Sequence, residues 1–178
     1  PHQPSYLIAT PTAAETLDVI VVGAGAAGLM CALVAGKRGR RVLLLEKNGK
    51  VGRKILISGG GRCNFTNTGA THEQYYSQNI HFSRSALSRY LPDDFIKMVQ
   101  GRGIAFHEKK LGQLFCNDSA RDIVDMLVDE CESNGVTIVC DANVTGVDGD
   151  GPFRVQSDDN LWTCTSLVIA SGGLSIPK

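Results

Sequence analysis

The sequence predicts an α/β fold with a parallel sheet and an antiparallel β-meander, and three patterns support this class. A βαβ unit is expected near the N-terminus, because an apolar run at residues 17–22 precedes a glycine turn, an Ala/Leu-rich stretch at 26–38 and a second apolar run at 41–45. Short alternating stretches separated by turn signals predict the meander over residues 143–165. An apolar run at 167–170 predicts a final buried strand.

The middle of the chain predicts smaller elements. Helices are expected at residues 83–90, 93–100 and 118–133, and short strands at residues 104–107, 113–115 and 136–139. The third helix has its apolar residues on one face, and Asp118 or Ser119 can cap its first turn. Residues 48–70 are rich in Gly, Asn and Thr without periodicity, which predicts a long loop of the kind that usually has a function.

Length and composition predict a globular protein rather than a fibrous or disordered one. The chain has 178 residues, of which 43% are hydrophobic and 20% charged, enough for one domain at 17–178 behind a disordered leader at 1–16. The 18 basic and 18 acidic residues balance to zero, so we expect no nucleic-acid or membrane partner. No apolar run is long enough to span a bilayer.

The cysteines indicate a cytoplasmic protein. Six are present without a CxxC pair, and no secretion signal is recognisable in residues 1–16, so reduced thiols are expected. No His or Cys grouping has metal-ligand spacing, and no metal is expected.

Glycine and positive charge gather in one stretch of the neutral chain. Ten of the 20 glycines lie between Gly23 and Gly61, and nine of the 18 basic residues lie between Lys37 and Arg62. Backbone N–H groups that no side chain covers, with cations nearby, favour an anionic ligand such as a phosphate.

The first of these glycines form a dinucleotide-binding motif. Residues 23–28 read GAGAAG and lie between the first predicted strand and helix, and Glu46 ends the next strand. In such a motif Gly23 permits the tight turn, Gly25 lets the backbone approach a pyrophosphate, and Gly28 lets helix and strand pack closely. A carboxylate at position 46 favours FAD or NAD over NADP, because it suits an unphosphorylated ribose. The alternative is a plain βαβ unit with a glycine turn.

A second glycine cluster follows at residues 53–67, RKILISGGGRCNFTN. Three consecutive glycines indicate a sharp bend or a close ligand. With Arg53, Lys54 and Arg62 around them, they can stabilise the edge of a flavin that becomes negative on reduction. The alternative is a glycine-rich surface loop. Cys63 can be a redox thiol beside Arg62, but a structural role is favoured because it has no CxxC partner.

A third small-residue element, Ser171-Gly172-Gly173, follows the last predicted strand. The carboxyl end of a strand in an open α/β sheet is where ligands bind, so this element is a candidate second backbone contact on the same dinucleotide. The alternative is a simple turn.

Four segments together resemble a known family. GAGAAG with Glu46-Lys47, then GRKILISGGGRCNFTN, HEKKLGQLFC and SGGLSIP are similar to signatures of the YhiN/BaiN-like flavoproteins. This family includes aminoacetone oxidase-like enzymes and belongs to the glutathione-reductase-like group of FAD proteins. The resemblance runs from about Leu17 to the C-terminus, and Ser171 departs from the family's Thr-Gly-Gly while keeping the hydroxyl.

The resemblance implies a Rossmann-like FAD-binding domain and a set of FAD contacts. The implied residues are Gly23, Gly25, Ala26, Ala27, Gly28, Glu46, Lys47, Arg53, Ser58, Gly59, Gly60, Gly61, Arg62, Cys63, Asn64, Val144, Ser171, Gly172 and Gly173. Val144 would contact adenine through its backbone. No residue is singled out as a catalytic acid or base, which suits chemistry that resides in the cofactor.

The implied function is a flavin-dependent oxidoreductase. Two-electron hydride chemistry on a small organic substrate is expected, with NAD(P)H or O₂ as partner, and both a reductase and an oxidase remain open. Family members are longer, with an inserted substrate domain and a C-terminal FAD segment, so the 178-residue chain alone is expected to be inactive. The alternative is a dinucleotide-binding sensor or scaffold without turnover.

Overall fold

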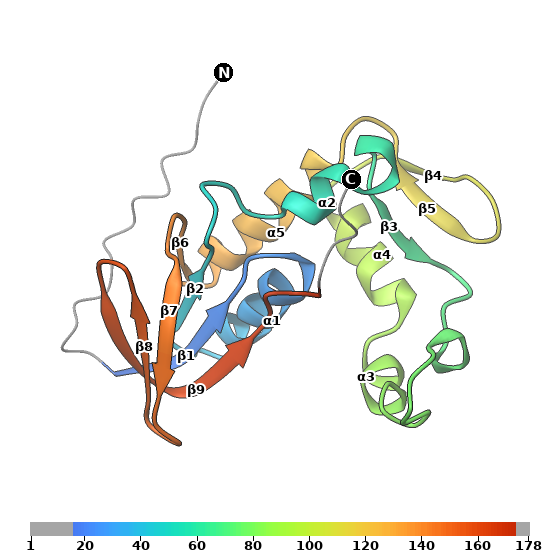
Figure 1. Cartoon of the computed structure of the whole chain (residues 1–178). Helices are drawn as coiled ribbons and strands as arrows, with labels where there is room; N and C mark the ends of the chain where they lie inside the picture. Colours follow the sequence, from blue (N-terminus) through green and yellow to red (C-terminus); the bar gives the residue numbers. More distant parts are fainter. Residues whose placement is uncertain (1–15, 174–178) are drawn as a thin grey trace. The chain divides into compact units, whose positions relative to one another are not determined.

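The computed structural model describes residues 16–173, and the chain divides into two compact units (Figure 1). Within the described residues, the first unit contains residues 16–54 and 127–173, and the second contains Ile55–Met126. The predicted leader lies outside the described residues except for Thr16, which begins the first strand.

A six-stranded sheet forms the centre of the first unit. Its order is β6 (Thr137–Val139), β2 (Val42–Leu45), β1 (Thr16–Val22), β9 (Leu161–Ile169), β8 (Phe153–Ser157) and β7 (Val144–Asp148). The first four of these strands pair in parallel, and β9, β8 and β7 pair antiparallel. The predicted parallel sheet and meander are therefore confirmed as two halves of one mixed sheet.

Strand β9 belongs to both halves. Its beginning pairs antiparallel with β8, and from Thr163 to Ile169 it also pairs in parallel with β1 (Figure 1). The prediction of a separate buried strand at 167–170 was wrong, since a nine-residue strand continues from Leu161 and Ile169 at its end is exposed. Alternating apolar residues indicate pairing but do not show where a strand changes its partner.

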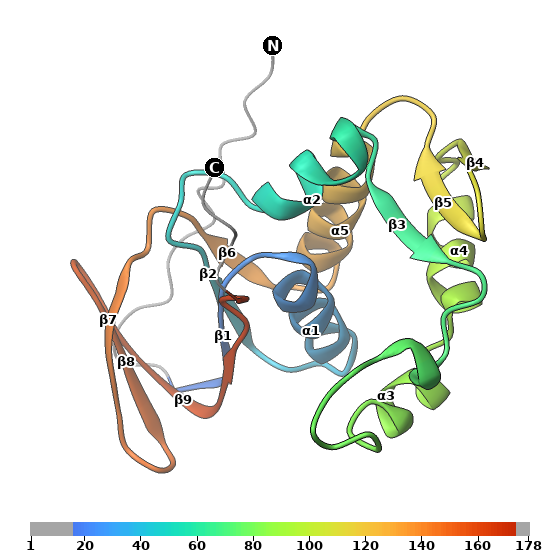
Figure 2. The ribbon, with the colours of Figure 1, turned by 45° about the vertical axis from the view of Figure 1, so that its right-hand side comes forward.

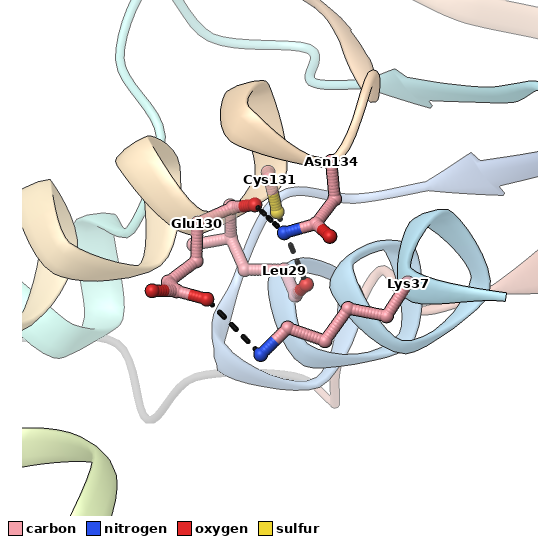
Figure 3. Close-up of polar contacts among 5 residues, drawn as sticks. All are labelled: Leu29, Lys37, Glu130, Cys131 and Asn134. Atoms are coloured by element: carbon pink, nitrogen blue, oxygen red, sulfur yellow. Dashed lines mark hydrogen bonds and ion pairs between the residues drawn. The ribbon is translucent and has the colours of Figure 1, made fainter. Parts of the chain in front are cut away.

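Helix α1 (Ala26–Lys37) is the predicted crossover helix between β1 and β2. Its buried residues Leu29, Ala32 and Leu33 explain why its sequence is apolar on most sides. The last part of α5 (Arg121–Ser133) lies beside it, as Figures 2 and 3 show. The Cys131 thiol donates to the Leu29 carbonyl oxygen at 3.4 Å, and Lys37 Nζ lies 3.0 Å from Glu130 Oε2.

The second unit contains more regular structure than predicted. Its three-stranded antiparallel sheet has the order β3 (Asn64–Asn67), β5 (Gln113–Cys116) and β4 (Phe106–Glu108). The chain enters it through α2 (Arg53–Ile57) and the short 3₁₀ turn η1 (Ser58–Gly61). The prediction of an irregular loop over residues 48–70 was therefore wrong for its middle, because β3 is fixed by a distant partner strand that local periodicity cannot reveal.

The predicted helices of this unit are confirmed. The elements between β3 and β4 are η2 (His72–Gln74), α3 (Arg84–Arg89) and α4 (Pro92–Gly101). Phe65 of β3 contacts Phe95 and Phe106 at centroid distances of 5.9 and 5.4 Å, which packs α4 against the sheet. At the start of α5, Ser119 Oγ accepts the Arg121 N–H at 3.1 Å, so Ser119 is the capping residue of the two that were expected.

No helix within residues 16–173 is long and apolar enough to cross a membrane.

Candidate cofactor site

The glycine turn between β1 and α1 has the geometry that the motif predicts. Gly23 has a φ of +104°, and a Cβ added there would lie 2.6 Å from the carbonyl oxygen of Ala170. A Cβ at Gly28 would lie 1.8 Å from the carbonyl oxygen of Gly23. Both positions therefore exclude any side chain. Gly23 allows the tight turn, and Gly28 allows the close contact of helix and strand.

Gly25 has a different role, because its missing side chain faces open space. It is the N-cap residue of α1 with a φ of −82°, and no atom lies within 4 Å of the position that its Cβ would take. The first N–H groups of a helix have no partner within the helix, and here the N-cap residue has no side chain to accept from them. The first turn also contains no acid. This uncovered positive end fits the pyrophosphate of a dinucleotide.

Glu46 lies at the end of β2 and is buried beside this turn. Its Oε2 accepts the N–H of Ala24 at 2.9 Å, and its Oε1 accepts the backbone N–H of Asn48 at 3.0 Å. The Asn48 side-chain amide also donates to Oε1. The carboxylate is thus held in one orientation between the glycine turn and the chain that follows β2.

Asn48 is a candidate site residue that the sequence did not single out. Its Nδ2 donates to Glu46 and its Oδ1 accepts from Arg53 Nη1, so it joins a candidate ribose contact to a candidate flavin contact. Its position two residues after Glu46 is the signal that was available, since Asn side chains commonly bond nearby backbone and side chains in turns.

The small-residue element after β9 lies next to the glycine turn. The Ala170 N–H donates to the Val22 carbonyl oxygen at 2.8 Å, and the Cβ that Gly23 lacks would lie 2.9 Å from Ser171 Cα. Lys54 Nζ donates to the Gly173 carbonyl oxygen at 2.9 Å. Lys54 was expected at the flavin end. In the structure it lies on α2 and holds Gly173 in place through this hydrogen bond.

Two further predicted contacts, Val144 and Lys47, are connected to Glu46 along the chain or through a backbone hydrogen bond. Val144 begins β7 and is half-buried, and the Ala142 N–H just before it donates to the Glu46 carbonyl oxygen at 2.9 Å. Lys47 follows Glu46 and is exposed. The first unit therefore brings together Gly23–Gly28, Glu46, Arg53, Val144 and residues 171–173.

Glu46 allows a prediction about the stability of the first unit. Replacing it by leucine leaves the Ala24 N–H without its acceptor next to a buried turn, so the free energy of unfolding should fall by about 1–3 kcal/mol. Urea unfolding without added cofactor measures this loss, and Glu46→Gln, which keeps an acceptor, should lose less. Equal losses in the two variants would show that the bond to Ala24 does not matter.

The triple glycine belongs to the second unit. Gly59, Gly60 and Gly61 have φ values of +58°, +69° and +88°, which confirms the predicted sharp bend. A Cβ at Gly59 would lie 2.7 Å from the Phe115 ring, whereas Gly60 and Gly61 face open space. The Gly61 carbonyl oxygen accepts the Ala120 N–H at 2.7 Å.

The residues around this bend hold it in place. The Ser58 hydroxyl donates to the Ile55 carbonyl oxygen at 2.8 Å, and its own carbonyl oxygen accepts the Cys63 N–H at 3.1 Å. The Arg62 carbonyl oxygen accepts the Cys116 N–H at 2.9 Å, and Asn64 begins β3. Ser58 to Asn64 are thus an ordered turn, and their contact with a flavin stays a prediction.

Cys63 has the structural character that the sequence favoured. It is buried with a φ of +50°, and burial raises the pKa of its thiol. A raised pKa keeps the thiol protonated at neutral pH, which makes it a poor nucleophile and a poor redox centre. The redox alternative is therefore not supported.

Burial also raises the pKa of Cys116 and Cys131 to about 12 and that of Cys140 to about 11. Unfolded thiols lose their proton near pH 9, while the folded ones keep it, so the free energy of unfolding should fall as pH rises above about 9. Urea midpoints at about pH 8 and about pH 10 test this dependence. In a Cys116→Ala/Cys131→Ala variant the free energy of unfolding should fall less between these two pH values. An equal fall would contradict the buried thiols as its cause.

Within residues 16–173, no group of three or more His, Cys, Asp or Glu side chains is arranged to hold a metal ion.

Comparison with known proteins identifies the family. The model of the HI0933-like protein Rossmann domain matches residues 17–178. The chain is 54% identical over 164 residues to a ribosomal RNA dihydrouridine synthase of Escherichia coli strain K12, covering 92% of this chain and 41% of the relative. It is 25% identical over 157 residues to a 3-dehydro-bile acid delta(4,6)-reductase of Clostridium scindens, covering 86% of this chain and 38% of the relative.

The chain thus spans about two fifths of the length of these curated relatives. Among solved structures, Lactococcus lactis thioredoxin reductase matches with a TM-score of 0.52 and 18% identity, over 91% of this chain and 37% of that chain. This likeness confirms the predicted Rossmann-like fold. The resemblance to YhiN/BaiN-like flavoproteins is confirmed as well: the chain belongs to the HI0933-like family of FAD-binding Rossmann domains.

Proposed function

We propose that the chain is the FAD-binding part of a flavin-dependent reductase. The observation that carries this proposal is the uncovered N-terminus of α1 at Gly25, with the carboxylate of Glu46 fixed beside it. The backbone N–H groups of the glycine turn would bind the pyrophosphate, and Glu46 would accept hydrogen bonds from the adenosine ribose. Residues 171–173 would contact the same dinucleotide from the end of β9.

When bound, FAD supplies two-electron chemistry. This chain's own residues would bind and orient it. Arg53 is positioned through Asn48, and Lys54 through the Gly173 carbonyl oxygen, so the loop after β2 and the end of β9 are held in defined positions. The ordered turn at Ser58–Asn64, with Arg62, would contact the flavin through backbone N–H groups and positive charge.

A reductase is favoured over an oxidase by the chemistry that the relatives' names describe. A dihydrouridine synthase saturates the C5=C6 bond of uracil, and a bile acid delta(4,6)-reductase saturates ring double bonds of a 3-oxo compound. In both kinds of compound the double bonds are conjugated to a carbonyl, so each reduction adds a hydride at the carbon farther from the carbonyl and a proton at the nearer one. NAD(P)H is the matching electron donor, because each double bond that is reduced takes up two electrons and two protons.

We propose a uridine of ribosomal RNA as the substrate, in place of the small organic molecule expected from the sequence. The support is the 54% identity to a relative of that name, against 25% for the bile acid enzyme. The expectation of no nucleic-acid partner depended on a net charge of zero, but a zero sum does not exclude local basic surfaces. The six free thiols are consistent with a cytoplasmic location, which we also propose.

The test uses the complete protein that contains this chain. We expect a flavin absorption spectrum that bleaches with NADH or NADPH, and an increase in the mass of uridine-containing ribosomal RNA by two hydrogen atoms per reduced base. A bleached flavin without RNA reduction would reject the substrate and keep the reductase. A protein that remains colourless after incubation with FAD would reject the cofactor, and bound FAD that NAD(P)H never reduces would favour a sensor or scaffold.

A further inference from the structure

Residues 75–91 of the second unit, here called the aromatic segment, expose large apolar side chains that the cofactor site does not use. The exposed ones are Tyr75, Tyr76, Ile80, Phe82, Tyr90 and Leu91. Tyr76 is 98% exposed and Phe82 is 80% exposed, so these rings make almost no contact within the described residues. A concentration of exposed apolar side chains usually marks an interaction surface.

The backbone of this segment is held by local hydrogen bonds in which the aromatic rings take no part. Asn79 Oδ1 accepts the His81 N–H at 3.0 Å, and the Asn79 carbonyl oxygen accepts the Phe82 N–H at 3.0 Å. The Ser77 hydroxyl donates to the same carbonyl oxygen at 2.6 Å. The polar side chains therefore bond their own backbone, while the rings remain available. Figures 1 and 2 both show the part of the segment before α3 lying beside that helix.

The charge around the rings is positive. Residues 74–92 contain no Asp or Glu, and Arg84 and Arg89 lie on α3, both exposed. Within the part of the chain that the structure describes, neither guanidinium takes part in an ion pair. Glu73 and Asp93 lie just outside this stretch. The surface thus combines aromatic faces with uncompensated cations, which favours an anionic partner that has flat apolar groups.

We propose that the aromatic segment binds an unpaired stretch of RNA. Tyr76 and Phe82 stack on bases, and Arg84 and Arg89 contact phosphates. Aromatic rings recognise unpaired bases because every base has a stacking face, and paired bases in a duplex do not offer theirs. This inference rests on the proposed function, since it names the surface that would hold the RNA whose uridine is reduced.

The experiment compares variants of the complete, FAD-loaded protein in binding to a short single-stranded oligouridine and to duplex RNA of equal length. Fluorescence anisotropy gives the Kd. Tyr76→Ala/Phe82→Ala should weaken single-strand binding by about 10-fold or more, with FAD content unchanged. Arg84→Gln/Arg89→Gln should lower the slope of log Kd against log salt by about 1.4, or about 0.7 for each lost phosphate contact. Leu111→Ala, also exposed at 86%, and Arg38→Gln are the matched controls and should bind like wild type.

Each other result overturns the proposal in a way that can be separated from the proposed function. If the wild type binds oligouridine and the aromatic variant binds equally well, the RNA surface lies elsewhere and the function stands. If the aromatic variant has a lower melting temperature or loses FAD, the rings are buried against other parts of the protein. If no RNA binds while the flavin remains reducible, both the surface and the RNA substrate are rejected.

Discussion

Replacing Gly28 by alanine is expected to abolish stable folding of the first unit. In a helix, alanine normally stabilises by about 1 kcal/mol relative to glycine. Here the new Cβ would lie 1.8 Å from the Gly23 carbonyl oxygen, which is itself fixed by the tight turn. Neither atom can move without separating α1 from β1, so a loss of more than about 4 kcal/mol is expected.

The measurement is the urea unfolding curve of the purified variant, or its recovery in inclusion bodies if no folded protein is obtained. Gly25→Ala is the matched control, because it lies three residues away and no atom lies within 4 Å of its Cβ position. The control should unfold like the wild type. A Gly28→Ala protein within about 1 kcal/mol of wild type would show that the helix can move away from the strand at little cost.

Replacing Gly25 by valine should remove FAD while leaving the fold intact. The backbone there is extended, with φ −82° and ψ −171°, which suits a β-branched residue. The added methyl groups would occupy the space in front of the α1 N-terminus and keep the pyrophosphate from the backbone N–H groups. Losing two such charge-assisted bonds corresponds to a loss of affinity on the order of 100-fold or more.

The ratio of flavin to protein absorbance after purification, and the Kd from titration with FAD, measure the effect. Gly101→Val is the matched control, because Gly101 ends α4 in the second unit and also has no atom within 4 Å of its Cβ position. It should retain FAD like the wild type. FAD retained by the Gly25→Val protein at wild-type affinity would show that the cofactor does not bind at the glycine turn.

The parts of the fold that the sequence could predict are those determined by local pattern. The turn at residues 23–28 was predictable because steric exclusion allows only glycine at two of its positions, and the apolar runs on either side indicate strands directly. Strand β3 was not predictable, because four residues are too few to show a period and its partner β5 lies far along the chain. The change of partner along β9 was not predictable either, because its partner β1 also lies far along the chain.

The candidate site divides in the same way. Glu46 could be found from its spacing after the motif, because the ribose lies at a fixed distance from the pyrophosphate. The hydrogen bonds that connect Arg53 through Asn48 to Glu46 could not be found from the sequence, since they depend on side-chain directions. Ser58–Asn64 form an ordered segment, and the flavin contacts expected from them stay a prediction.

The position of β1 in the sheet has a consequence during synthesis. Val19 pairs with Val42 on one side and with Ser166 on the other, so its second neighbour is made only near the end of this chain. At about 5–20 residues per second, β1, α1 and β2 leave the ribosome several seconds before β9 does. During that time the apolar side chains of Ile20 and Val21 lack the strand that completes their sheet. Chaperones should therefore bind ribosome-bound nascent chains that end before β9 more strongly than chains that include it.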